Sequence, residues 1–219
     1  APNGFEIRLS NGTAVHARAI IIASGVQYRR LPLENLARFE GAGVYYAATT
    51  TEARLCGDEE VAVVGGANSA GQAAVFLAAQ ARRVHVLIRG PGLADTMSRY
   101  LIRRIEETRN ITLHPHTELV ALHGDDRLRS VTWRGPEGTE THPLAHVFLM
   151  IGAQPNTAWL GGCVALDDKG FVKTGTDLTA EDLSRTRWLV ARPPFLFETS
   201  RHRVFAVGDV RSGSVKRVA

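Results

Sequence analysis

The strongest constraint on the fold is a short apolar run that leads into a glycine turn and then into an alanine-rich segment. Residues 60–64 (Glu-Val-Ala-Val-Val) have the composition of a buried strand, and Gly65-Gly66 closes it. Residues 68–82 contain no proline and favour a helix. Because strand, tight turn and helix in this order form the first half of a βαβ unit, an α/β protein with a parallel sheet is expected.

The residues of this turn suit the diphosphate of a dinucleotide. Gly65 permits the tight turn, small residues allow the backbone to approach a phosphate, and a helix N-terminus supplies free N–H groups and a positive dipole end. Ala67 departs from the usual fingerprint, because it adds a methyl group at the second glycine position. A glycine turn without a ligand is the alternative. The candidate contacts are Gly65, Gly66, Ala67, Asn68, Ser69 and Ala70.

The residue that follows the next apolar run, residues 84–88, indicates which of the two nicotinamide dinucleotides such a site would prefer. NAD sites usually carry an acid there for the ribose 2′-hydroxyl, whereas a 2′-phosphate favours arginine. This sequence has Ile88-Arg89-Gly90 and no acid. Arg89 therefore favours NADPH, with NADH still possible, and Arg99 is a candidate for a second phosphate contact.

The rest of the chain is mostly of β character. A helix is predicted to start at Asp95 or Thr96, to end near Asn110 and to place Met97, Tyr100, Leu101 and Ile105 on one face. Strands are predicted at 5–9, 15–22, 111–114, 118–123, 128–133, 145–151 and 203–207, with the apolar run 19–23 in a buried strand. This order predicts a parallel sheet with an antiparallel β meander on one face. Residues 177–200 are left unassigned.

Composition and charge argue against several other functions. The chain has 26 Lys+Arg and 22 Asp+Glu, and its aromatic residues do not interleave with the basic ones, so no nucleic acid is expected as a partner. The longest apolar runs, 19–23 and 147–151, are far shorter than the roughly 20 residues of a membrane span. A cytoplasmic protein without membrane contact is expected. The spacings of the His and Cys residues predict no metal site.

Three motifs, taken together, resemble those of the thioredoxin reductase-like flavoprotein disulfide reductases. They are Gly-Gly-Ala-Asn-Ser-Ala (65–70), Ile-Gly-Ala-Gln-Pro-Asn-Thr (151–157) and Thr-Ser-Arg-His-Arg-Val-Phe-Ala-Val-Gly-Asp (199–209). The resemblance covers nearly the whole chain. It adds Ile151, Gly152, Gly208 and Asp209 to the candidate cofactor contacts, with Asp209 at the position of the aspartate that contacts FAD in the family.

The resemblance also implies a domain organisation. It predicts a Rossmann-like, three-layer FAD/NAD(P)-binding fold with parallel sheet and antiparallel β meander, plus part of a second such domain. Residues 43–156 would form the NAD(P)H-binding domain, and residues 1–42 and 157–219 would form a partial FAD-binding domain.

One departure from the family concerns its redox dithiol. Thioredoxin reductases carry a Cys-x-x-Cys whose thiolates relay electrons, but Ala47 and Thr50 stand at the corresponding positions here. No catalytic residue is therefore assigned. The resemblance implies hydride transfer from NADPH to FAD, and then electron transfer to a non-dithiol acceptor such as a quinone, ferredoxin, flavodoxin or oxygen. The alternative is a non-catalytic NADPH-binding or redox-sensing module of a larger regulatory protein.

A second departure concerns the flavin. The N-terminal FAD fingerprint of the family has no counterpart here, and the sequence opens at Ala1 close to a predicted strand. A fragment is therefore expected, lacking a unit on the order of 100 residues. FAD would belong to the full-length parent, and this chain alone would be inactive and hold no flavin. The partners would be small nucleotide cofactors and an unknown electron acceptor, and a homodimer stays open.

Overall fold

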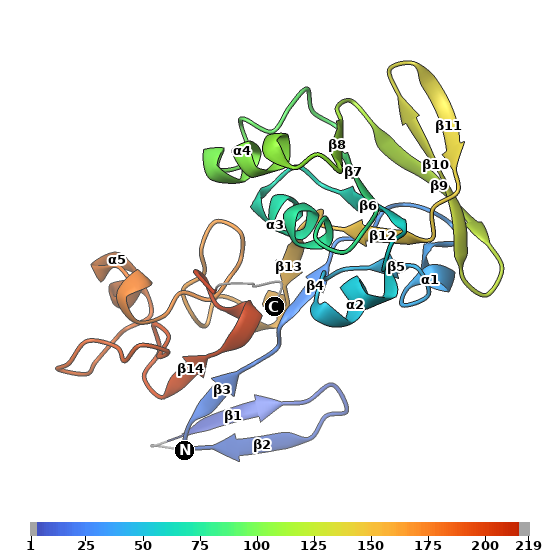
Figure 1. Cartoon of the computed structure of the whole chain (residues 1–219). Helices are drawn as coiled ribbons and strands as arrows, with labels where there is room; N and C mark the ends of the chain where they lie inside the picture. Colours follow the sequence, from blue (N-terminus) through green and yellow to red (C-terminus); the bar gives the residue numbers. More distant parts are fainter. Residues whose placement is uncertain (1–3, 215–219) are drawn as a thin grey trace. The chain divides into compact units, whose positions relative to one another are not determined.

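The chain forms two compact units in a computed structural model that describes residues 4–214 (Figure 1). Within the described residues, unit 1 comprises 4–27 and 153–214, and unit 2 comprises 28–152. The chain passes between the units at two places, and the segments there pair as strands β4 (Val26–Tyr28) and β13 (Ala153–Pro155).

Unit 2 is built on a five-stranded sheet in which all paired strands are parallel. Its inner strands are buried on both faces, as expected for a parallel sheet that is covered on both sides. Four strands of this sheet were predicted and are confirmed to within a few residues, whereas β5 was not predicted. In spatial order the five strands are β5 (Val44–Tyr45), β12 (His146–Leu149), β6 (Glu60–Val64), β7 (Arg83–Leu87) and β8 (Ile111–His114).

Helices α2 (Thr50–Leu55), α3 (Asn68–Leu77) and α4 (Arg99–Glu107) cover one face of this sheet (Figure 1). The predicted helix at 68–82 was too long at its C-terminal end. Residues 79 and 80 continue as tight turns with hydrogen bonds to the third residue back, because the chain must reverse before Arg82 N–H bonds to the carbonyl oxygen of Glu59 at 2.9 Å.

The start of α4 also differs from its prediction. Ser98 precedes the first helical residue and neither Asp95 nor Thr96 caps it. The Thr96 hydroxyl instead donates to the carbonyl oxygen of Gly66 at 2.6 Å. Tyr100, predicted on the buried face, is 65% exposed and accepts a hydrogen bond from Arg104.

An antiparallel meander of β9 (Glu118–Gly124), β10 (Leu128–Gly135) and β11 (Gly138–His142) packs on the opposite face of the sheet, together with α1 (Leu36–Phe39). This confirms the three-layer arrangement. The prediction missed β11, because its residues Gly-Thr-Glu-Thr-His contain no apolar face and are mostly exposed. They form a strand by pairing with β10.

A cluster of rings lies between the sheet and the meander. His85 Nδ1 is 3.0 Å from His114 Nε2, and His85 Nε2 is 3.1 Å from a carboxylate oxygen of Glu60. The rings of Trp133 and His142 stack with centroids 3.6 Å apart. Burial lowers the pKa values of both His85 and His114, and for His85 this effect outweighs the neighbouring Glu60 carboxylate.

Mild acidification is expected to destabilise unit 2. Because the pKa values of His85 and His114 lie below the ordinary 6.5, the unfolded chain binds more protons than the folded chain just below that pH. The free energy of unfolding should therefore fall between about pH 7 and about pH 5.5, measured by urea unfolding. His114→Gln should flatten this dependence, whereas His16→Gln on the exposed strand β2 (Ala14–Ala17) should not. An unchanged slope in His114→Gln would contradict the assignment.

Unit 1 contains the hairpin of β1 (Phe5–Arg8) and β2, and a pair of parallel strands, β3 (Ile20–Ile22) and β14 (Val204–Ala206). The predicted continuous strand at 15–22 is wrong, because the chain breaks between β2 and β3. The run 19–23 is also less buried than predicted: Ile22 enters the core, but Ile21 points to the other face and is 68% exposed.

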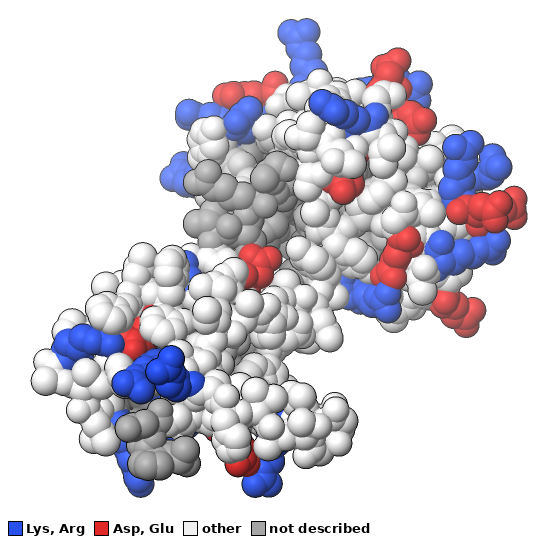
Figure 2. Space-filling model, turned by 90° about the horizontal axis from the view of Figure 1, so that it is seen from below, with Lys and Arg blue, Asp and Glu red and all other residues white. Residues whose placement is uncertain are grey.

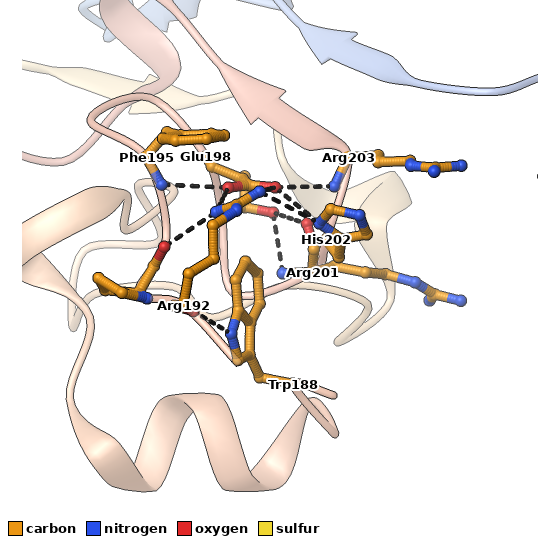
Figure 3. Close-up of polar contacts among 9 residues, drawn as sticks. Trp188, Arg192, Phe195, Glu198, Arg201, His202 and Arg203 are labelled. Atoms are coloured by element: carbon orange, nitrogen blue, oxygen red, sulfur yellow. Dashed lines mark hydrogen bonds and ion pairs between the residues drawn. The ribbon is translucent and has the colours of Figure 1, made fainter. Parts of the chain in front are cut away.

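The unassigned segment 177–200 contains helix α5 (Ala180–Arg185) and is anchored by a buried carboxylate (Figure 3). Glu198 is fully buried and accepts hydrogen bonds from Arg192 at 2.7 Å and from the backbone N–H groups of Phe195 and Arg203 at 3.0 Å each. His202 Nδ1 lies 3.1 Å from the same carboxylate. Burial alone would raise the pKa of Glu198, but these donors, Arg192 above all, lower it to about 2.

Within the described residues, the remaining elements of unit 1 are three short 3₁₀ helices. They are η1 (Ala158–Leu160), η2 (Gly175–Asp177) and η3 (Gly208–Val210).

No helix within residues 4–214 is both long and apolar enough to cross a bilayer.

Candidate dinucleotide site

The glycine turn lies at the carboxyl end of β6, where only glycine fits at its first position. Gly65 has a φ of +140°, and a Cβ atom there would lie 2.4 Å from the carbonyl oxygen of Met150. Its N–H donates to the carbonyl oxygen of Leu87 on β7 at 3.0 Å. The turn is therefore enclosed by the ends of the two neighbouring strands, and a side chain would displace backbone.

Backbone donors without a partner converge at the N-terminus of α3. The first hydrogen bond of the helix runs from the N–H of Ala70 to the carbonyl oxygen of Ala67 at 2.9 Å. Within residues 4–214, no acceptor contacts the four preceding N–H groups, and the last three of their residues are exposed. Such a set of donors at a positive dipole end suits a phosphate group. The four are those of Gly66, Ala67, Asn68 and Ser69.

The departures from the glycine fingerprint cause no strain. Ala67 has φ −100° and ψ 178°, an extended conformation that any residue adopts, and its methyl group is exposed. Ala70 is fully buried, and its Cβ lies 3.3 Å from the position of a Cβ on Gly65. A small residue at position 70 therefore allows helix and strand to pack closely.

Two contacts that the sequence did not predict hold the 89–98 loop against the turn. Besides the bond from Thr96 to Gly66, the backbone N–H of Ser98 donates to Asn68 Oδ1 at 2.8 Å. Residues 30 positions apart in the chain form both bonds, so no local pattern signals them. Gly71 was also missed: a Cβ there would lie 2.7 Å from the sulfur of Met97, so glycine brings α3 close to this segment.

Arg89 and Arg99 flank the same loop. Ile88 lies beside Gly66, because a Cβ atom added to Gly66 would be 3.4 Å from the Ile88 side chain. Arg89 directly follows Ile88. Arg99 directly follows Ser98. Both arginines are exposed, and neither has an acidic partner in the part of the chain that the structure describes. On the face shown in Figure 2, basic side chains are interspersed with acidic ones rather than forming one continuous stripe.

Ile151 and Gly152 follow β12, at the same carboxyl edge of the sheet as the glycine turn. The N–H of Met150 donates to the carbonyl oxygen of Val64 at 2.8 Å, which brings the two strand ends together. Ile151 packs against the core beneath the meander, and Gly152 is exposed with a φ of +96°.

The predicted flavin contacts lie in unit 1. Gly208 and Asp209 follow β14, and the N–H of Val207 donates to the carbonyl oxygen of Ile22 at 3.0 Å. The carboxyl ends of β3 and β14 therefore share one edge, where ligands bind in open α/β sheets. The Asp209 carboxylate accepts a 3.3 Å hydrogen bond from Ser214 and is half-buried, so it can also accept from ligand hydroxyl groups.

The positions of the family's redox cysteines carry no thiol chemistry. Ala47 precedes α2 and Thr50 is its exposed first residue. Cys56 ends the same helix but is buried, and its Sγ lies 3.1 Å from the carbonyl oxygen of Glu52. Burial and the nearby carboxylates raise the pKa of Cys56 to about 12, so it is not a nucleophile at neutral pH.

A parallel sheet whose glycine turn presents free N–H groups at a helix N-terminus is the arrangement found in dinucleotide-binding α/β folds. The chain belongs to the pyridine nucleotide-disulphide oxidoreductase family, whose sequence profile matches residues 4–219.

Individual relatives extend this assignment. The chain is 30% identical over 177 residues to a thioredoxin reductase of Streptomyces clavuligerus, covering 80% of this chain and 54% of the relative. It is 32% identical to a thioredoxin reductase of Chlamydia trachomatis, covering 88% of this chain and 57% of that relative. It is also 32% identical to an NADH dehydrogenase of Bacillus subtilis, covering 77% of this chain and 33% of that relative. The chain thus spans between about a third and about three fifths of these relatives.

Solved structures establish the fold. Thioredoxin reductase from Streptococcus pyogenes matches with a TM-score of 0.75 at 22% identity, over 98% of this chain and 67% of that one. Thioredoxin reductase from Lactococcus lactis matches with a TM-score of 0.71 at 20% identity, over 100% of this chain and 65% of that one. The predicted family and fold class are therefore confirmed, and the individual site residues and the domain boundaries stay predictions.

Proposed function

We propose that this chain is the NADPH-binding portion of an FAD-dependent oxidoreductase. The observation that carries the proposal is the set of four unpartnered N–H groups after β6, which suits the diphosphate of a dinucleotide. When bound, the nicotinamide would supply a hydride and the flavin would accept it. In this proposal the protein contributes the glycine turn for the diphosphate, Arg89 for the 2′-phosphate and Asp209 for flavin hydroxyl groups.

The proposed electron acceptor is not a dithiol served by a cysteine pair of this chain. Ala47 and Thr50 support this, since neither forms a thiolate, and the thiol of Cys56 is buried with its pKa raised to about 12. The acceptor would react directly with the reduced flavin and would belong to a class such as quinones, ferredoxins, flavodoxins or oxygen.

The intact protein is expected to be yellow and to lose its flavin absorbance band when NADPH is added without oxygen. Reduction by the bound dinucleotide removes the absorbance of oxidised flavin, so an absorbance titration in an anaerobic cell measures it. A protein that stays colourless with added FAD would contradict the enzyme proposal and favour a redox-sensing module that only binds NADPH.

Replacing Arg89 by alanine is expected to weaken NADPH binding by about tenfold or more and to leave NADH binding unchanged. A guanidinium that contacts the 2′-phosphate contributes a charge-assisted pair that NADH cannot form. Isothermal titration of the intact protein with both dinucleotides measures the difference. Arg103→Ala is the matched control, because Arg103 is exposed on α4 and lies 4.0 Å from Glu107. Equal losses for both dinucleotides would contradict the role of Arg89.

A further inference from the structure

An open cavity of about 520 Å³ in unit 1 is lined by residues from the end of α5 and from the segment before β14. Part of its lining comes from residues 177–200, to which the sequence assigned no role. The cavity has four basic side chains and no acidic residue in its lining: Arg185, Arg187, Arg201 and His202. The exposed thiol of Cys163 and the apolar side chain of Leu189 also line it.

Within residues 4–214, two of the arginines that line this cavity have no acidic partner, and a third has only a weak one. Among the residues that the structure describes, Arg187 and Arg201 have no carboxylate within ion-pair distance. Arg185 lies 3.9 Å from Glu181, and both side chains are largely exposed, so Glu181 neutralises the charge of Arg185 only weakly. The Arg201 guanidinium lies 5.5 Å from the centroid of the Phe5 ring, a contact that leaves its positive charge without a carboxylate. An anion in the cavity would therefore meet cationic side chains that no acidic residue of the lining neutralises.

Arg187 lies just after α5 in a left-handed backbone conformation. Its φ is +55°, and its N–H donates to the carbonyl oxygen of Ser184 as α5 ends. Helices commonly end with glycine in this left-handed conformation, which a residue with a side chain adopts only at a cost. Arg187 nevertheless carries a side chain at this position and lines the cavity.

The buried Glu198 orients His202 at the rim of the cavity (Figure 3). His202 Nδ1 lies 3.1 Å from one oxygen of the Glu198 carboxylate, and Arg192 donates to both oxygens, at 2.7 Å and 3.2 Å. His202 Nε2 has no partner within residues 4–214 and points away from that carboxylate. Glu198 is therefore a positioning residue, which leaves one nitrogen of His202 available to a ligand.

We propose that this cavity binds the phosphate group of a small organic phosphate. A phosphate group presents three acceptor oxygens, enough for several guanidinium forks, whereas a carboxylate presents two. Leu189 is 92% exposed and provides an apolar surface for the organic part. The site is separate from the edge that carries Gly208, because Arg201 and His202 precede β14 and Gly208 follows it.

Protection of Cys163 from alkylation tests the proposal in the intact protein. Iodoacetamide is uncharged and reaches the exposed Cys163, whereas Cys56 is buried with its pKa raised to about 12. Phenyl phosphate is expected to slow alkylation of Cys163 saturably, measured by mass spectrometry. Phenol, and sodium chloride at matched ionic strength, should not protect. No protection by phenyl phosphate, or equal protection by phenol or chloride, would overturn the proposal.

Three variants separate binding from folding. Arg187→Gln combined with Arg201→Gln is expected to raise the phenyl phosphate concentration needed for protection by about tenfold or more. Arg187→Gly should also weaken protection without lowering the midpoint of thermal unfolding, because glycine suits the left-handed backbone. Arg18→Gln, an exposed arginine of unit 1 outside the cavity, should behave as wild type. Unchanged protection in the double variant would refute the site.

Discussion

Replacing Glu198 by alanine is expected to lower the free energy of unfolding by about 3 to 5 kcal/mol. The carboxylate is fully buried and accepts hydrogen bonds from Arg192 and from two backbone N–H groups. Its removal leaves buried donors and a guanidinium group without a partner, which costs more than the loss of one surface ion pair. Urea unfolding of the intact protein at neutral pH measures the change.

Glu181→Ala is the matched control, since Glu181 is exposed on α5 and lies 3.9 Å from Arg185. Its effect should stay below about 0.5 kcal/mol. The contribution of Glu198 should also depend on pH with a defined sign. Because its folded pKa is lowered to about 2 from 4.5, the stabilisation is complete above about pH 5 and is lost as the pH falls through this interval. Equal effects of the two substitutions would contradict the role of Glu198.

Replacing Gly65 by alanine is expected to abolish measurable NADPH binding and to destabilise unit 2 by about 2 to 4 kcal/mol. The new Cβ would lie 2.4 Å from the carbonyl oxygen of Met150, and the φ of +140° is unfavourable for alanine. The backbone must shift, and the N–H groups that follow would no longer converge on one phosphate. Isothermal titration and urea unfolding measure the two effects.

Gly92→Ala is the control for this substitution. Gly92 lies in the loop after β7, and a Cβ there would meet nothing within 4 Å. Normal NADPH binding in Gly65→Ala, or a loss of equal size in Gly92→Ala, would argue against the glycine turn as the diphosphate site.

Local patterns predicted most of the parallel sheet but not the contacts that complete the site. The strand at 60–64 and the turn at Gly65 follow from composition and spacing, because both depend on neighbouring residues. The bonds of Thr96 and Asn68 join residues that are distant in the chain, so no periodicity reveals them. Strand β11 was missed for a related reason, since its pairing partner rather than its polar sequence makes it a strand.

The cavity in unit 1 shows the same limit. Arg185, Arg187 and Arg201 are ordinary surface residues in the sequence, and their gathering depends on the fold of a segment that has no clear periodicity. Glu198 gave no signal either, because a glutamate next to Thr199 and Ser200 looks like a loop residue until its buried hydrogen bonds are seen. Chemistry that depends on buried charge is therefore the part that sequence reasoning recovers least.

The two bonds that fasten the 89–98 loop to the glycine turn have a consequence for selectivity. Thr96 and Asn68 fix the loop through Gly66 and Ser98, so the segment that carries Arg89 is already ordered before a dinucleotide arrives. The conformational entropy of this loop is lost on folding and not again on binding. Discrimination between NADPH and NADH would then depend on contacts alone, without a penalty for closing a lid.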